Sequence, residues 1–173
     1  MHNKRFKKNH MLLLSITALI IITILAYFML ESYLTNATNA AHYKSFTVNN
    51  QTFNFTYVAV TEKQLEAGLM NKTVTNSTFM LFVFPASSIY PFWMFNTYYN
   101  LDIIWVNSSS VQTNANSISA KVVYVQQNAT PCLHGEICVL YTPTNKSDFV
   151  IEAQSGFAKA HDVAIGSKLQ INK

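Results

Sequence analysis

One acidic side chain stands in an otherwise apolar stretch and is the first candidate for chemistry. Asp102 interrupts the run from Leu101 to Val106, and this run has the length and composition of a buried strand. A buried carboxylate without partners is costly, so Asp102 needs hydrogen-bond donors or water around it. It is therefore expected to serve either a ligand or the fold itself.

Polar and aromatic residues just before this strand could complete a binding site. Asn96 and Thr97 precede Asp102 and could form the polar floor of a ligand cleft at the same end of the sheet. Trp93 and Tyr98 would then offer flat faces on which a sugar or another planar group could stack. In the alternative interpretation, Asp102 ties a loop to the backbone and Trp93 belongs to the core.

The sequence gives little support for catalysis or for a bound metal. Asp102 with Glu152 or Glu66 could supply the two carboxylates of a glycoside hydrolase, but no spacing supports such a pair, and no catalytic residue is assigned. The methionines could be thioether ligands of a soft metal, although methionine more often fills gaps in a core. We expect no cofactor and no metal.

The only two cysteines are Cys132 and Cys138, close together in the sequence. In an exported domain such a pair first indicates a disulfide, which would hold one loop in shape. The alternative is a metal site that also uses His134 and Glu136, which lie between the two thiols. Because a second ligand pair is missing, the disulfide is the favoured interpretation.

The N-terminal segment has the sequence of a membrane anchor. Residues 1–10 contain four basic residues and no acid, and residues 11–30 contain no charged residue, proline or glycine. A helix of ~20 residues rises about 30 Å, which is enough to cross the hydrocarbon core of a bilayer. The basic residues place the N-terminus in the cytoplasm by the positive-inside rule.

A cleaved signal peptide is the main alternative to this anchor. Its apolar region is usually shorter and is followed closely by a small-residue cleavage site, which this chain lacks. We therefore expect a single-pass protein of the cell membrane that contacts the lipid bilayer through the anchor. Its expected parts are a cytoplasmic tail (1–10), the transmembrane anchor (11–30), a stalk (31–42) and an extracytoplasmic domain (43–173).

The rest of the chain has the composition of an exported domain that does not bind nucleic acid. Four of the twelve basic residues lie in residues 1–10, so the rest of the chain has eight lysines and eight acidic residues. Because these charges balance, no basic surface for nucleic acid is expected. Asn-x-Ser/Thr sequences mark glycosylated surface loops of exported proteins. They begin at Asn36, Asn50, Asn54, Asn71, Asn76, Asn107, Asn128 and Asn145.

The apolar patterns predict a mainly β domain. Strands are expected at 43–48, 52–60, 79–84, 101–106, 118–125, 148–153 and 168–172. Thr61 and Gln64 have the spacing of a capping box and begin a helix, and Ser155 could cap a second, short helix that ends near His161. We expect a compact antiparallel barrel or sandwich with two short helices, preceded by one transmembrane helix.

Several sequence blocks resemble one known family. They are Glu66-Ala-Gly-Leu-Met70, Met80-Leu-Phe-Val-Phe-Pro85, Phe92-Trp-Met-Phe-Asn-Thr97, Leu101-Asp-Ile103 and a closing stretch from Phe149 to Gly166. In this order they resemble the domain of unknown function 192 family over about Tyr43 to Ile171. The resemblance implies a compact, mainly β domain, often exported or membrane-anchored, with no settled activity. The resemblance also implies that the family usually has a basic residue at the position of Phe95, a proline at that of Asn100 and an arginine near Lys72. This chain departs from the family at these positions.

These observations lead to one leading hypothesis and two alternatives. The leading hypothesis is a non-catalytic extracytoplasmic domain that binds a ligand or partner, for instance a surface glycan, while it is held at the membrane. The first alternative is an accessory subunit of a larger membrane complex, in which the anchor packs against other helices. The second is an envelope glycan hydrolase.

Overall fold

The computed structural model describes residues 16–32, 34–35, 42–114 and 116–173, and for residues 109–114 it describes the backbone only. The chain divides into two compact units, Met1–Thr38 and Asn39–Lys173. The expected cytoplasmic tail lies outside the described residues, as do residues 11–15 of the expected anchor, most of the stalk and the sequon at Asn36.

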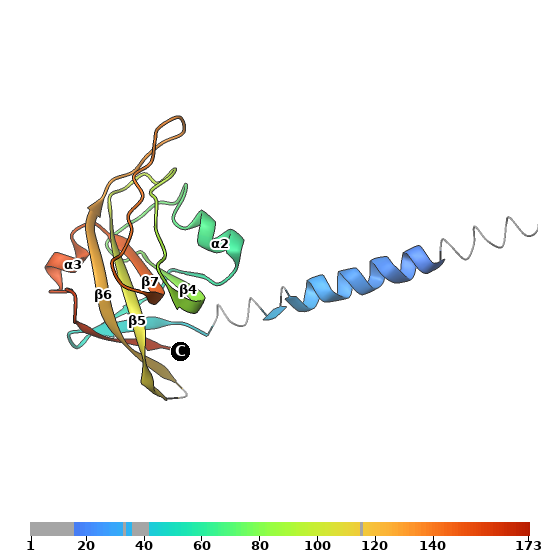
Figure 1. Cartoon of the computed structure of the whole chain (residues 1–173), viewed down its shortest axis with the longest axis horizontal. Coiled ribbons are helices and arrows are strands. Elements are labelled where there is room, and N and C mark those ends of the chain that lie inside the picture. The colour runs from blue at the N-terminus through green and yellow to red at the C-terminus, as the bar shows by residue number, and fades with distance from the viewer. Residues whose placement is uncertain (1–15, 33, 36–41, 115) are drawn as a thin grey trace, which may run out of the picture. The chain divides into compact units, whose positions relative to one another are not determined.

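The N-terminal unit consists of a helix at residues 16–32, drawn in blue in Figure 1. Its large apolar side chains are exposed, among them Leu19, Ile22 and Phe28. Over the residues that the structure describes, no helix has both the length and the apolar character that crossing a membrane requires.

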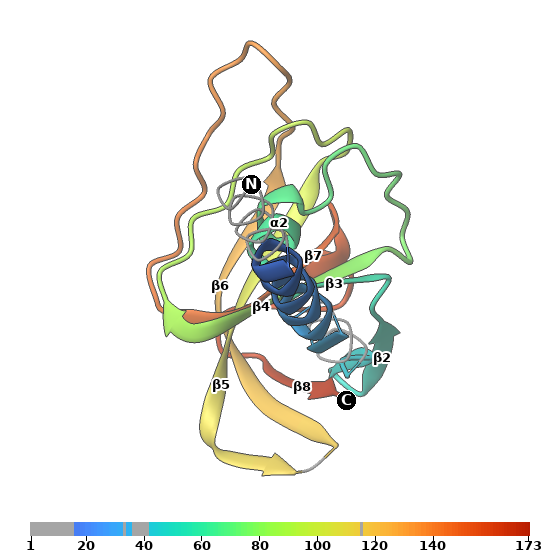
Figure 2. The same cartoon turned by 90° about the vertical axis from the view of Figure 1, so that its right-hand side faces the viewer.

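The second unit is built on one eight-stranded sheet that curls into a half-barrel (Figures 1 and 2). In spatial order the strands are β2, β1, β8, β6, β5, β7, β4 and β3. Their bounds are β1 (Ser45–Val48), β2 (Gln51–Asn54), β3 (Tyr57–Ala59), β4 (Phe79–Ser88), β5 (Leu101–Asn114), β6 (Ser117–Ala129), β7 (Ser147–Gln154) and β8 (Lys168–Asn172). Neighbouring strands are antiparallel except β3 and β4, which are parallel. The mainly β prediction is therefore confirmed.

Both faces of the sheet are covered, so the domain has two apolar clusters. Along β4, Phe79 and Leu81 belong to one cluster, and Met80 and Phe82 belong to the other. The first cluster also takes in side chains of helix α3 (Phe157–Ala160), and the second packs against helix α2 (Glu62–Ala67) and the segments around it. Burial on both faces explains why residues 79–84 of β4 and 149–153 of β7 are nearly continuous apolar runs rather than alternating ones.

The single strand expected at 52–60 is in fact two strands at opposite ends of the sheet. Phe55 N donates to Lys44 O at 2.9 Å, whereas the next backbone nitrogen, that of Thr56, donates to Phe79 O at 2.8 Å. The chain thus passes from the β2 edge to the β3 edge within two residues, which brings the two edges of the half-barrel together. Because β3 then runs parallel to β4, the expectation of an antiparallel barrel or sandwich was wrong at this edge.

The two helices begin in different ways. In α2, Thr61 Oγ1 accepts from Gln64 N at 3.4 Å and Gln64 Oε1 accepts from Thr61 N at 3.1 Å, which confirms the capping box. For α3 the prediction of a Ser155 cap was wrong. Gly156 is the N-cap, and the Ser155 hydroxyl donates to Asn128 Oδ1 at 3.0 Å.

Candidate functional site

The end of α2 brings the backbone close to the sheet. Gly68 ends the helix with φ 47°, and its N–H donates to Gln64 O at 3.0 Å. A Cβ at Gly68 would lie 3.4 Å from Phe82 Cζ and 3.8 Å from Glu152 Oε2. The positive φ and this close approach both favour glycine, and together they set the turn after α2 directly over Glu152.

Glu152 is a buried acid without a full set of partners. It lies on β7 between Met80 of β4 and Ile103 of β5, and its side chain is 3% exposed. Its Oε2 is buried and has no hydrogen-bond partner. Burial disfavours the charged form and raises the pKa of the Glu152 carboxyl to about 8. At neutral pH this acid is therefore mostly protonated.

The Glu152 carboxyl lines a small cavity, which we call the Glu152 cavity. Its walls come from residues 65–70 at the end of α2, from Phe82 on β4, and from the segment before β5. That segment contributes Phe92, Trp93, Phe95 and Thr97. The cavity leaves about 20 Å³ for the centres of water-sized spheres, which is enough for about one water molecule or a group of similar size.

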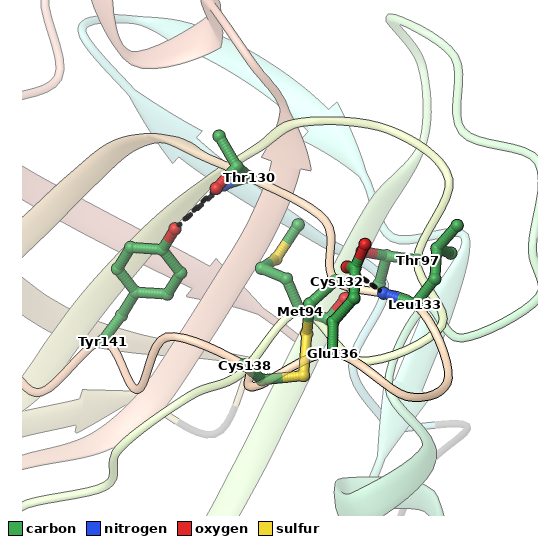
Figure 3. Close-up of a disulfide and its surroundings, with 8 residues drawn as sticks. All are labelled: Met94, Thr97, Thr130, Cys132, Leu133, Glu136, Cys138 and Tyr141. Atoms are coloured by element: carbon green, nitrogen blue, oxygen red, sulfur yellow. Dashed lines mark hydrogen bonds between the residues drawn. A yellow bond between two sulfur atoms is a disulfide. The ribbon is translucent and has the colours of Figure 1, made fainter.

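The loop between β6 and β7 (residues 130–146), which we call the disulfide-bonded loop, holds one wall of this cavity. Phe92 and Tyr141 exchange backbone hydrogen bonds of 2.9 and 2.8 Å. Further along the same wall, Cys132 N donates to Met94 O at 3.0 Å, and Asn96 N donates to Cys132 O at 2.8 Å. Figure 3 shows the disulfide beside Met94 and Thr97. The loop therefore fixes the backbone of the segment from Phe92 to Asn96 at both ends.

The disulfide between Cys132 and Cys138 is confirmed, with their Cα atoms 5.4 Å apart. The alternative, a metal site with His134 and Glu136, does not fit because both sulfurs are bonded to each other. Glu136 instead stabilises the loop, since its Oε2 accepts from Leu133 N at 2.8 Å (Figure 3).

Asp102 serves the fold and not this cavity. Its carboxyl is fully buried and accepts hydrogen bonds from three backbone nitrogens, those of Asn128 at 2.9 Å, Gly156 at 3.1 Å and Ala158 at 2.9 Å. It thereby joins the end of β6 to the start of α3. Asp102 is two residues before Ile104, on the face of β5 opposite to that of Ile103. It does not line the Glu152 cavity.

The structure brings two of the other expected site residues to the cavity. Thr97 is buried and lines it, with its hydroxyl donated to Met94 O at 2.8 Å. Trp93 also lines it and is 44% exposed, so it is not a core residue. Asn96 and Tyr98 are not part of the lining; the Tyr98 hydroxyl donates to Asn71 Oδ1 at 2.7 Å.

Glu152 is not among the residues predicted to bind a ligand. It interrupts the apolar run from Phe149 to Ala153 just as Asp102 interrupts its own strand. The same signal was thus present twice, but only Asp102 was considered as a ligand-binding residue. Phe95, where the family resemblance implies a basic residue, also lines the cavity. The lining of the cavity in this chain therefore contains no basic residue.

The fold and the site together define a small half-barrel domain with a buried acid beneath an aromatic wall. A family model, DUF192, described as "Uncharacterized ACR", matches residues 45–171. The chain therefore belongs to the domain of unknown function 192 family. Four of the segments that carry this resemblance, around Gly68, Phe82, Trp93 and Glu152, contribute to the cavity.

Several solved structures are similar to the chain, among them the following two. One is a candidate transcription regulator from Sinorhizobium meliloti 1021, with 26% sequence identity and a TM-score of 0.56, over 72% of this chain and 88% of that one. The other is a protein of unknown function from Novosphingobium aromaticivorans DSM 12444, with 24% identity and a TM-score of 0.56, over 72% of this chain and 81% of that one. No curated protein matches the chain.

Proposed function

We propose that this protein is a membrane-anchored, extracytoplasmic domain that binds a small ligand, or one group of a larger ligand, in the Glu152 cavity without catalysing a reaction. The observation that carries this proposal is the unpartnered Oε2 of Glu152 at a cavity wall. A buried polar atom without a partner destabilises the native state by about 1–3 kcal/mol. The other buried acid of the sheet, Asp102, has three partners, so this fold can satisfy a carboxylate where only the fold requires it.

The proposed location rests on the N-terminal sequence and on the disulfide. Residues 11–30 are apolar and follow a basic segment, and disulfides persist mainly outside the cytosol. The sequon asparagines at positions 50, 54, 71, 76, 128 and 145 are exposed. Asn107 is half-buried and its amide donates to Lys146 O at 3.1 Å. We propose that the exposed positions are the sites of any N-linked glycan.

The accessory-subunit alternative is favoured by one surface feature. The disulfide-bonded loop exposes large apolar side chains, with Ile137 100% exposed, Leu140 60% and Leu133 49%. Exposed apolar groups that lie together are typical of a protein contact. Purification of the full chain from its native membrane in mild detergent tests this alternative. A partner that is retained at constant stoichiometry, and is lost from an Ile137→Ser variant, would favour a complex subunit.

The hydrolase alternative is less well supported. Glu66 and Glu152 line the same cavity, so two carboxyl groups border it, but Asp102 is not part of the lining. The space beside Glu152 is water-sized, so a sugar ring would have to remain at the mouth, against Trp93. Binding is therefore the function that the geometry supports best.

A ligand screen tests the proposed function directly. The full-length protein in mild detergent is screened against small metabolites and oligosaccharides by the increase in Tm that binding to the native state produces. A ligand of the cavity should stabilise the wild type and lose most of its effect in Glu152→Gln. It should keep that effect in Glu62→Gln, which alters an exposed acid of α2 outside the lining. If every ligand found acts equally on both variants, binding does not involve the cavity.

A further inference from the structure

The titratable groups that line the Glu152 cavity are both acids. Glu66 is exposed on α2, and Glu152 is buried on β7. The positions paired with Glu152 on the adjacent strands are Met80 and Ile103, neither of which titrates. The third polar side chain of the lining, Thr97, already donates its hydroxyl proton to Met94 O. This set of groups favours a ligand that is positively charged and donates hydrogen bonds.

Aromatic rings make up much of the remaining wall. Phe82 and Phe92 are in edge contact with ring centroids 4.8 Å apart, and Trp93 and Phe95 are 5.5 Å apart. The faces of aromatic rings attract cations, and the attraction strengthens when the cation is removed from water. The apolar walls and the acids therefore favour the same kind of ligand.

The size of the cavity restricts which cation fits. About 20 Å³ is available for the centres of water-sized spheres. An –NH₃⁺ group is close to water in size, whereas a trimethylammonium group is several times larger. A bare metal ion would find too few ligands, because the described part of the chain contains no group of three or more side chains that could hold one.

We infer that the Glu152 cavity binds the primary ammonium group of an organic amine, with the Glu152 carboxylate as its counter-ion and the adjoining methylene groups against Trp93 and Phe95. This inference rests on the proposed binding function. A free alkylamine and a lysine side chain present the same –CH₂–NH₃⁺ group, and either could supply it.

Binding is then coupled to the release of a proton. In the empty cavity burial raises the pKa of Glu152 to about 8, so the carboxyl is mostly protonated at pH 7. When R–NH₃⁺ binds, the carboxyl gives its proton to the solvent and becomes the carboxylate partner of the ammonium, and no other bond changes. Protein molecules in which Glu152 is already ionised bind the amine without this step. Because their fraction rises roughly tenfold from pH 7 to pH 9, the affinity for the amine rises by the same factor. An alkylammonium ion stays protonated over this range.

The experiment is a calorimetric titration of the full-length protein in mild detergent with n-butylammonium, at pH 7 and pH 9. The lysine arm uses N-acetyl-lysine-methylamide. We expect butylammonium to bind with the release of about one proton at pH 7, and to bind roughly 10- to 100-fold more weakly to Glu152→Gln, which removes a charge-assisted hydrogen bond. Glu62→Gln should bind like the wild type. Tighter binding of the lysine compound would identify a peptide as the source of the amine, and tighter binding of butylammonium would identify a free amine.

Two matched compounds separate failure of this inference from failure of the proposed function. If n-butanol binds as tightly as n-butylammonium, the assignment of an ammonium group is overturned but the cavity remains a ligand site. If butyltrimethylammonium binds as tightly, the size argument is overturned. If neither these compounds nor any screened ligand binds, both the proposed binding function and the assignment of an ammonium group are refuted. Should Glu152→Gln not fold, the wild type alone decides, because affinity for butylammonium that does not rise between pH 7 and pH 9 refutes the pairing with Glu152.

Discussion

The burial of Glu152 makes the stability of the domain depend on pH in an unusual direction. Its pKa is about 8 in the native state, against 4.5 for an unperturbed glutamate. Between these two values the native state binds more protons than the unfolded state, so the free energy of unfolding falls as the pH rises. The contribution is fully present below about pH 4.5 and is lost by the time the pH has passed 8.

The magnitude follows from the linkage relation. Each pH unit within this window is worth at most 1.36 kcal/mol, so the loss from pH 5 to pH 7 is about 2.5 kcal/mol, and the loss over the whole window is about 5 kcal/mol. Glu152→Gln replaces the carboxyl by a neutral amide of the same shape. It should therefore remove this dependence while keeping the size and shape of the side chain.

The assay is urea-induced unfolding of the wild type and of Glu152→Gln, followed by circular dichroism at pH 5, 6 and 7. The difference between the two proteins cancels the titration of groups that do not interact with Glu152. We expect the stability of the wild type to fall relative to that of the variant by about 2.5 kcal/mol over this range. A difference that stays constant with pH would mean that Glu152 has an ordinary pKa in the native state, which would refute the reasoning.

Three further predictions concern the frame around the cavity. Asp102→Ala should lower the free energy of unfolding by about 3–5 kcal/mol, because three backbone N–H groups, one of them buried, lose their acceptor, as measured by urea unfolding at pH 7. Gly68→Ala should lower it by about 1–3 kcal/mol through backbone strain and contact with the Phe82 ring. Gly135→Ala is its control in thermal unfolding, because Gly135 also has a positive φ but a Cβ added there would have no neighbouring atom within 4 Å. An equal loss of stability in both variants would show that the contact with Phe82 contributes nothing. The double variant Cys132→Ser, Cys138→Ser should lose about 2 kcal/mol and bind ligand more weakly; unchanged ligand affinity would contradict the support of the cavity wall by the loop.

Local sequence patterns predicted those elements whose signal lies within a few neighbouring residues. The capping box at Thr61 and the strand at 168–172 are where the pattern placed them. The break at Phe55 and Thr56 was missed because it depends on two partners that are distant in sequence, Lys44 and Phe79. Alternation alone cannot show that a strand changes from one edge of a sheet to the other.

The candidate site was predictable only in part. An acid within an apolar run does indicate a buried carboxyl, and Asp102 does have the donors that it was expected to need. Which of two such acids faces its donors and which faces a cavity depends on the packing of α2 and of the segment before β5. That packing is set by tertiary contacts, so the sequence alone could not separate Asp102 from Glu152.

The position of β8 in the sheet has a consequence for how the domain is made. The strand lies between β1 and β6 and pairs with both, so the last strand of the domain joins its first hairpin to the rest of the sheet. Until β8 is available, the β1–β2 hairpin has no neighbour along one side, and an isolated hairpin is marginally stable in water. Folding of the domain therefore cannot be completed before residues 168–172 have been synthesised. A polypeptide that lacked these final residues would lack the middle of its sheet, not merely an edge.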